Sequence, residues 1–364
     1  MAESAATRTE PARIPRDWEV SPAWITHLVN RDHPGAVVTE VSRVGGSEGT
    51  SSRAVLRLTY GSGSGPATLF AKTKGDPLRR LFQWMTDNAF IEGRLALSGA
   101  PLPIEHPRFY GGVVERRRLD DMVVMADMSA QGAVLNDATT PLSVEEVASG
   151  LRGLARLHSR YWGMRDAAEV GLDWVRPCAA PPTFRFLVRL GCTRGLPRLR
   201  DHLPSEVAAL GASGMIHHWR RQVRAVRQGP QTLLHGDAHV GNTYTLPNGD
   251  LGFYDWGVVR SGHWSFDVGY FVISALDVED RRRHAAELVE EYRSALEVPE
   301  PDRPSRQEAW LRFRTATPYG LAIWVTTGAE DGYQAPAICQ NLTARFGQAF
   351  LDLDTPAALS ELGV

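Results

Sequence analysis

Lysine is the amino acid that this sequence most nearly lacks. Only Lys72 and Lys74 occur in 364 residues, and all the other positively charged side chains are arginines. Arginine replaces lysine freely on a solvated surface, but not where a compact point charge is needed. We therefore expect a functional role for at least one of these lysines, and chance retention on a solvated strand is the alternative.

Other absences exclude whole classes of protein. The sequence has no apolar run of about eighteen residues, so no membrane span is expected. The formal net charge is −2, so the chain lacks the excess of basic residues that is typical of nucleic-acid-binding proteins. Cys178, Cys192 and Cys339 are too widely spaced for a zinc site or a disulfide framework, which predicts buried structural roles. The N-terminal stretch has no signal-peptide core, so a cytoplasmic location is expected.

The composition is that of a soluble globular protein, with 43% hydrophobic and 23% charged residues. The length allows two lobes or two ordinary domains with a sizeable core. Residues 1–20 are rich in Ala, Pro, Thr and Arg and are predicted to form a disordered arm. We expect either a monomer or a homodimer.

The most informative stretch is HGDAHVGN, residues 235–242, followed by YDWG, residues 254–257. Apolar β-type runs flank both motifs, which predicts loops on rigid strands, where chemistry usually takes place. Asp237 and Asn242 are five positions apart, as are the proton-accepting Asp and the Mg²⁺-binding Asn of protein kinases. Asp255 then corresponds to the second metal-binding Asp. A surface turn rich in Gly, Asp and His is the alternative.

These motifs resemble the aminoglycoside phosphotransferase and choline kinase superfamily, because Gly236 and Trp256 replace the Arg and Phe of protein kinases. LARLHSRYW, residues 154–162, and SGHWSFDVGYF, residues 261–271, look most like the choline-kinase-like and ecdysteroid-kinase-like branch. The resemblance implies an α+β, two-lobed protein-kinase-like fold. Residues 21–127 would form a small β-rich nucleotide-binding lobe, and residues 128–364 a larger, mainly helical lobe with the catalytic loop.

Within the first lobe, Ser21 and Pro22 predict the start of a helix over residues 21–33. Alternating apolar residues then predict two strands joined by a Gly/Ser loop, residues 45–51, with a third strand over residues 67–74. This loop either covers the nucleotide phosphates with its backbone N–H groups or is an ordinary hairpin. The candidate contacts in it are Gly46, Ser47, Gly49 and Thr50.

Lys72 occupies the place of the lysine on the third strand of protein kinases, and strand alternation puts Lys74 on the same face. We choose Lys72 as the phosphate ligand. The spacing of residues 78–99 is helical, and the resemblance implies that Glu92 on this helix pairs with Lys72; a solvated glutamate is the alternative. Residues 120–129 predict a buried strand followed by a linker, where the resemblance implies that the backbone of Ala126 and Met128 binds adenine.

In the second lobe, Ser143 and Glu146 predict a capping box at the start of a helix. We interpret His158 as a core histidine rather than a catalytic one. The resemblance implies that Asp267 anchors the catalytic loop through its backbone. Trp264, Trp324 and Tyr333 could line an apolar pocket, but core packing is the preferred interpretation.

The predicted function is therefore ATP-dependent phosphorylation of a small-molecule hydroxyl, with no nucleic-acid or membrane partner. Asp237 is the expected base, Asn242 and Asp255 the expected Mg²⁺ ligands, and Lys72 with Glu92 the expected phosphate-positioning pair. Two alternatives are a kinase-like nucleotide-binding protein without turnover and an enzyme of the same fold that transfers AMP.

Overall fold

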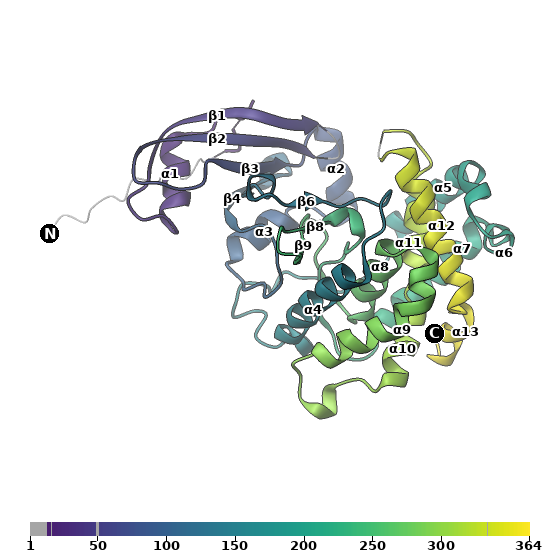
Figure 1. Ribbon diagram of the computed structural model, residues 1–364. Helices are drawn as coiled ribbons and strands as arrows, with labels where there is room; N and C mark the ends of the chain where they lie inside the picture. The colour runs from purple at the N-terminus through teal and green to yellow at the C-terminus, as the bar shows by residue number, and fades with distance from the viewer. Residues whose placement is uncertain (1–12, 16, 49–50, 333) are drawn as a thin grey trace. The chain divides into compact units, whose positions relative to one another are not determined.

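The computed structural model describes residues 13–15, 17–48, 51–332 and 334–364. The chain divides into two compact units. The first unit comprises residues 1–99 and 107–132, and the second comprises residues 100–106 and 133–364. The predicted fold class is confirmed, because the first unit is built on a β-sheet and the second is mainly helical (Figure 1).

An antiparallel five-stranded sheet of order β1-β2-β3-β5-β4 forms the centre of the first unit. The predicted helix before the sheet is present as α1, which packs against β1, whereas α3 packs against β4 and β5. On β2 the buried side chains alternate along the strand, as expected for a sheet with one face in the core. The strands are β1 Val37–Glu48, β2 Ser52–Ser62, β3 Thr68–Thr73, β4 Phe109–Glu115 and β5 Asp120–Ala126, and the helices are α1 Pro22–Asn30, α2 Pro77–Met85 and α3 Ile91–Ser98.

The predicted glycine-rich loop is shorter than the sequence suggested. Gly46 and Ser47 lie within β1 and pair with Ala54 and Arg53 of β2. Gly46 has φ 138°, and a Cβ there would lie 2.1 Å from the carbonyl oxygen of Arg53. A glycine is therefore required at this position because two backbones come together, and not because it lies in an open loop. The candidates Gly49 and Thr50 lie outside the described residues.

The single helix predicted over residues 78–99 is wrong, because α2 ends at Met85 and α3 begins at Ile91. Between them Asp87 and Phe90 have positive φ angles of 65° and 64°. The Thr86 hydroxyl donates to the carbonyl of Phe82, as short polar side chains often do near a helix end. Five large apolar side chains of α2 are exposed: Leu78, Leu81, Phe82, Trp84 and Met85.

The second unit packs helices around the short strands that carry the HGDAHVGN loop. β6, β8 and β9 form one small sheet, and β7 pairs with β10. The strands are β6 Val134–Leu135, β7 Thr232–Leu234, β8 Thr243–Thr245, β9 Leu251–Phe253 and β10 Arg260–Gly262. The helices are α4 Val144–Arg160, α5 Pro182–Leu199, α6 Ser205–Ala209, α7 Gly211–Val226, α8 Ser265–Ala275, α9 Val278–Ala295, α10 Arg306–Arg314, α11 Thr317–Thr327, α12 Pro336–Asp352 and α13 Thr355–Glu361.

Helix α8 is the centre of this unit, since every one of its residues is buried. Most of its residues are apolar, so the helix has no solvated face, as expected for a helix in the core. The predicted capping box is present at α4, where Ser143 accepts from the Glu146 N–H and Glu146 accepts from the Ser143 N–H. The three cysteines are buried and unpaired with one another, as predicted.

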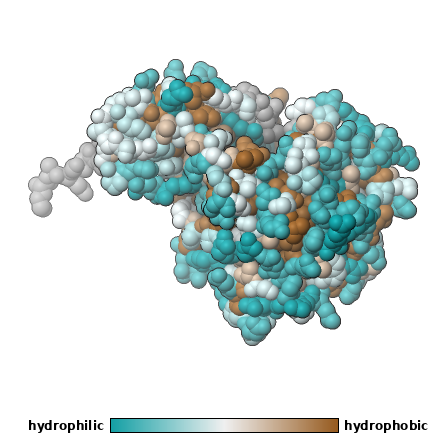
Figure 2. Space-filling view, in the orientation of Figure 1, coloured by the Kyte–Doolittle hydropathy of each residue, from teal (hydrophilic) through white to brown (hydrophobic). Residues whose placement is uncertain are grey.

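The surface and the helices of the described residues can be compared with the hydropathy that the sequence predicts. Hydrophilic residues predominate on the face shown in Figure 2, and hydrophobic residues appear between them. In the described part of the chain, no helix combines the length and the apolar character that crossing a membrane requires.

Candidate active site

The HGDAHVGN loop runs from β7 to β8 and ends in a short 3-10 turn, Val240–Asn242. Its first turn is fixed by Asp267 of α8, whose carboxylate accepts hydrogen bonds from the backbone N–H groups of His235 at 2.6 Å and Gly236 at 3.0 Å. Asp267 is fully buried and lies in the first turn of α8, where the helix dipole favours a negative charge. The predicted anchoring role of Asp267 is confirmed.

Gly236 is required by the backbone of this loop. Its φ is 82°, and a Cβ would lie 2.2 Å from the carbonyl oxygen of Val258. An L side chain would be strained and would also collide with backbone. Gly241 has no such φ, but a Cβ there would lie 2.8 Å from the ring of His239. The two glycines of this loop are therefore required for different reasons, Gly236 because of its φ and Gly241 because there is no space for a side chain.

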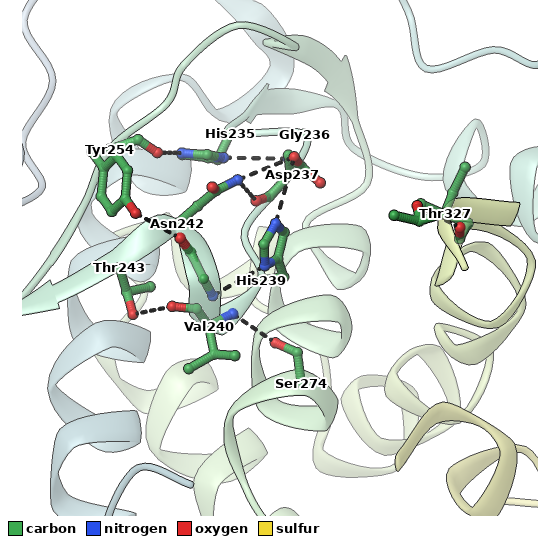
Figure 3. Close-up of polar contacts among 12 residues, drawn as sticks. His235, Gly236, Asp237, His239, Val240, Asn242, Thr243, Tyr254, Ser274 and Thr327 are labelled. Carbon is green, nitrogen blue, oxygen red and sulfur yellow. Dashed lines mark hydrogen bonds and ion pairs between the residues drawn. The ribbon is translucent and has the colours of Figure 1, made fainter. Parts of the chain in front are cut away.

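His235 joins the loop to the YDWG segment. Its Nε2 lies 3.0 Å from the Tyr254 carbonyl, and its Nδ1 accepts from the Asp237 N–H at 3.3 Å, so the proton resides on Nε2 (Figure 3). Burial lowers the pKa of His235, which keeps the ring neutral in this arrangement. Two further bonds join the same segments, since Tyr254 donates its N–H to the Asn242 carbonyl at 3.0 Å and its hydroxyl to the Gly241 carbonyl at 2.7 Å.

Asn242 holds Asp237 in place. Its side-chain N–H group donates to the Asp237 carbonyl at 2.9 Å and to the Asp237 carboxylate at 3.1 Å (Figure 3). These bonds use the nitrogen of the amide and turn its oxygen away from Asp237. The amide oxygen is the atom that a hard metal ion would bind.

Asp255 has a φ of 63°, in the left-handed region that few residues other than glycine adopt, although Asp enters it more readily than most. The charge of Asp255 is close enough to raise the pKa of Asp237. The structure thus brings the three predicted residues of this unit, Asp237, Asn242 and Asp255, into one site.

The environment of Asp237 makes it a stronger base than an ordinary aspartate. Burial, followed by the nearby charges of Asp255 and Asp267, raises its pKa to about 6, although His235 and the Asn242 hydrogen bond oppose the shift. The side chain is still 31% exposed, so water reaches the carboxylate and moderates this effect. A base whose pKa lies just below neutral is well matched to accept a proton at physiological pH.

His158 is the core histidine that the sequence predicted. It is fully buried, with Nδ1 at 2.8 Å from the Tyr292 hydroxyl and Nε2 at 3.4 Å from the Asp267 carboxylate. Both ring nitrogens have partners, and one partner is the aspartate that fixes the loop. His158 therefore contacts the site only indirectly, through Asp267.

Sequence reasoning missed the side chains that surround Asp237. His239 Nε2 lies 3.8 Å from its carboxylate, and Asp237 contributes to raised pKa values of Tyr270 and Tyr319, for which burial is the larger cause. His239 also contacts the Trp324 ring, at 5.0 Å between ring centres. The sequence did contain a signal for two of these residues. His239 is part of the HGDAHVGN motif itself. Tyr270 follows Asp267 by three positions on α8, so Tyr270 and Asp267 lie on one face of the helix.

In the first unit, the expected contact between Lys72 and Glu92 is present. The Lys72 ammonium lies 2.9 Å from the Glu92 carboxylate, and both side chains are buried, in β3 and in the first turn of α3. Lys74 is buried as well but has a different partner, Asp121, at 3.6 Å. The other oxygen of Asp121 accepts the Gly93 N–H at 2.8 Å, next to Glu92 in the chain. The two lysines therefore pair with different carboxylates in this unit.

The predicted adenine-binding segment follows the buried strand β5. Ala126 donates its N–H to the Arg108 carbonyl at 2.9 Å, and the Met128 carbonyl accepts from Gln131 at 3.0 Å. Asp127 between them accepts from the Thr68 hydroxyl at 2.8 Å and from the Ser129 N–H at 3.1 Å. The Asp127 side chain therefore fixes the course of the backbone there.

One protein family and several solved structures are similar to this chain. The model of the phosphotransferase enzyme family, abbreviated APH, matches residues 96–308. Among curated proteins none matches the chain. The structure is similar to that of a spectinomycin phosphotransferase in complex with ADP and spectinomycin, with 12% identity, a TM-score of 0.50, and coverage of 92% of this chain and 99% of that chain.

Two other solved structures are less similar. One is a choline kinase from Streptococcus pneumoniae, with 13% identity, a TM-score of 0.44, and coverage of 87% of this chain and 94% of that chain. The other is an aminoglycoside-3'-phosphotransferase of type VIII, with 18% identity, a TM-score of 0.42, and coverage of 81% and 97%.

Proposed function

Because the chain belongs to the phosphotransferase enzyme family, whose model matches more than half of it, we propose that it transfers the γ-phosphoryl group of ATP to a hydroxyl of a small molecule. One observation carries the proposal. A partly exposed carboxylate, Asp237, is held by the amide of Asn242 and lies close to Asp255, in the arrangement that a base and two metal ligands require.

Asp237 is the proposed base. As the acceptor oxygen forms a bond to the γ-phosphorus and the bond from that phosphorus to ADP breaks, the hydroxyl proton passes to the Asp237 carboxylate. The raised pKa, about 6, strengthens the carboxylate as a base and leaves it ionised at neutral pH. The Asn242 amide fixes the direction in which the carboxylate points.

Asn242 and Asp255 are the proposed Mg²⁺ ligands, and their oxygen atoms suit a hard cation. The hydrogen bonds from the Asn242 nitrogen leave its oxygen directed away from Asp237, and Asp255 lies close enough for its charge to act on Asp237. Mg²⁺ bound there would supply positive charge that neutralises the transferring phosphoryl group.

The proposed nucleotide contacts lie in the first unit. Glu92 holds the Lys72 ammonium, which would contact the phosphates. Gly46 and Ser47, with Gly49 and Thr50 beyond the described residues, would cover the phosphates. The ADP in the structure of the similar spectinomycin phosphotransferase supports ATP as the donor.

Adenine recognition is proposed to use the Ala126 carbonyl and the Met128 N–H. The other backbone group of each residue already has a partner within the unit, which favours this choice. Because backbone groups are used, this recognition would not depend on the side chain at position 126.

The test is ATP-dependent ADP release, measured with Mg²⁺ and a panel of hydroxylated metabolites and antibiotics. Asp237→Asn is the matched control, since it keeps the shape of the side chain and removes its basicity. The phosphotransferase is supported if a compound stimulates ADP release and gains the mass of a phosphoryl group. A product that gains an adenylyl group would identify AMP transfer, and ATP binding without any product would identify a non-catalytic protein.

A further inference from the structure

Helix α3 carries Glu92, and the residue that precedes this helix cannot cap it. That residue is Phe90, whose φ is 64° and whose apolar side chain has no atom that could accept a hydrogen bond from the backbone. The first backbone N–H groups of an α-helix have no partner within the helix, and a capping side chain normally accepts from one of them. With only eight residues, α3 also depends on outside contacts for its stability.

Asp121, on another element, supplies the cap. It belongs to β5, and one of its carboxylate oxygens accepts the N–H of Gly93 at 2.8 Å. Gly93 is the third residue of α3, so its N–H is one to which the side chain of an ordinary capping residue would bind. The Asp121 side chain is 1% exposed, so the bond lies in the core. A hydrogen bond to a charged acceptor is stronger than one to a neutral acceptor.

Gly93 allows the carboxylate to come this close to the helix. A Cβ at position 93 would lie 2.8 Å from the Cβ of Asp121 and 2.8 Å from the oxygen that accepts the hydrogen bond. A side chain there would therefore push the carboxylate away. Glycine weakens a helix, and in α3 it follows Glu92 directly in the first turn. The contact with Asp121 explains why a glycine occupies this position.

The second carboxylate oxygen of Asp121 faces Lys74. The Lys74 ammonium lies 3.6 Å from it, and both side chains are buried. This oxygen makes no hydrogen bond within the described residues, so Lys74 acts on it by charge alone. A buried carboxylate is costly unless an opposite charge compensates it. One oxygen of Asp121 therefore holds α3, and the other is balanced by the second of the two lysines.

The same sheet therefore places both members of the pair between Lys72 and Glu92. Lys72 lies on β3, which pairs with β5, and β5 pairs with β4 on its other side. Asp121 is part of β5, so its backbone is fixed within the sheet. Glu92 directly precedes Gly93, the residue that Asp121 holds. A shift of this hydrogen bond would move Glu92 and change its 2.9 Å contact with the Lys72 ammonium.

We propose that Asp121 is a positioning residue, which caps α3 from β5 and thereby holds Glu92 against the Lys72 ammonium in the geometry that binds the phosphates of ATP. This assignment rests on the proposed phosphotransferase function and adds to it the group that sets the position of Glu92. Asp121 acts through α3 and not by contact with the nucleotide. Its loss should therefore weaken ATP binding only as far as ATP binding depends on Glu92.

The first experiment compares two double variants by isothermal titration with ATP and Mg²⁺. Both contain Lys74→Met, so neither leaves a buried lysine without its partner, and uncharged replacements of a buried pair are usually tolerated. Asp121→Asn keeps an oxygen that can accept the Gly93 N–H, whereas Asp121→Leu has a similar volume and no acceptor. We expect the Asn variant to bind ATP nearly as tightly as the natural protein does, and the Leu variant to bind it about fivefold more weakly.

Equal dissociation constants for ATP in the two variants would overturn the assignment of Asp121 and leave the phosphotransferase function intact. Failure of the natural protein to bind ATP would instead overturn the proposed function. Circular dichroism checks that both variants are folded at the temperature of the titration. If the Leu variant is not folded, Lys74→Met with Asp121→Ala takes its place, since alanine also lacks an acceptor and occupies less space beside Gly93.

The second experiment separates positioning from a general loss of stability. Glu92→Gln removes the charge that holds Lys72, and with it the group that Asp121 is proposed to position. In this background, Asn and Leu at position 121 should give the same dissociation constant for ATP, although Leu should still lower the unfolding temperature. Residues that act through one another show such coupling, and independent residues do not. A fivefold difference that persists without Glu92 would overturn the assignment.

Discussion

The two regions that carry the proposed chemistry are held in different ways. In the first unit, Lys72 is held by a buried ion pair with Glu92, and the neighbouring Lys74 by one with Asp121. In the second unit, the loop with Asp237 is held by hydrogen bonds that its backbone N–H groups donate to the Asp267 carboxylate and to the His235 ring.

The two regions are held differently because one must position the ammonium of a lysine and the other the carboxylate of an aspartate. A lysine has a long flexible side chain, and only a fixed opposite charge can keep its ammonium in one position. Asp237 has a short side chain, so fixing its backbone nearly fixes its carboxylate. Side-chain charge therefore fixes Lys72, the proposed phosphate contact, and backbone geometry fixes Asp237, the proposed base. Four sets of substitutions test this contrast, here in order of decreasing expected effect on activity.

The largest effect is expected from Asp255→Ala, which removes the charged metal ligand. Turnover should fall by roughly a thousandfold or more, because the charge of the transferring group is then poorly neutralised. Asn242→Ala should be less severe, since it removes a neutral ligand, and both variants should need more Mg²⁺. Circular dichroism checks that the fold is kept. Full activity of the natural protein in excess chelator would contradict the metal assignment.

Asp237→Asn should lower kcat by at least about a hundredfold, since the amide keeps the shape but cannot accept the proton. The dissociation constant of ATP should change little, because the backbone of the loop is still held by Asp267. Measuring kcat and ATP binding on the same variant separates the two effects. Near-normal turnover would exclude Asp237 as the base.

Lys72→Ala and Lys74→Ala remove the same side chain from neighbouring buried positions. We expect Lys72→Ala to raise the dissociation constant of ATP by about tenfold, and Lys72→Arg not to restore it, because a planar guanidinium does not fit a point-charge site. Lys74→Ala should instead lower the free energy of unfolding, by up to about 3–5 kcal/mol for a broken buried pair, and leave ATP binding nearly unchanged. Isothermal titration and thermal unfolding measure the two quantities, and equal ATP defects would contradict the separate roles.

Asp267→Asn should have the smallest effect on turnover. The amide offers one acceptor oxygen where the carboxylate offered two, so one of the two backbone N–H bonds is lost. We expect a stability loss of about 1.5–3 kcal/mol and a severalfold decrease in kcat. Thermal unfolding and kinetics on one sample give both values. An unchanged unfolding temperature would show that the loop is not held from α8.

The sequence predicted the parts of this architecture that depend on local patterns. The alternation along β2, the capping box at Ser143 and the buried run of β5 were predicted because each is determined by neighbouring residues. The motif spacing also predicted the neighbourhood of Asp237 and Asn242. The assignment of Lys72 to Glu92 came from the family resemblance, and the contact is present.

What the sequence could not predict depends on contacts between distant residues. The break between α2 and α3 lies at two residues with positive φ, which their residue types did not suggest. The strand pairing of Gly46 was hidden because glycine serves equally in a loop and at a close backbone approach. Trp324 reaches His239 from α11, and no periodicity of the chain joins residues so far apart.

The bonds among His235, Gly241, Asn242 and Tyr254 have a consequence for how such a protein can diversify. These residues lie within twenty positions, and they fasten the proposed base and the proposed metal ligands to one another through β8 and β9. Outside the segment, α8 holds it through Asp267 and Ser274, and Asn136 and Glu146 hold β8. Mutations in helices that make none of these contacts can therefore accumulate without disturbing the reacting groups, so substrate preference can drift by single steps, each of which leaves a working catalyst.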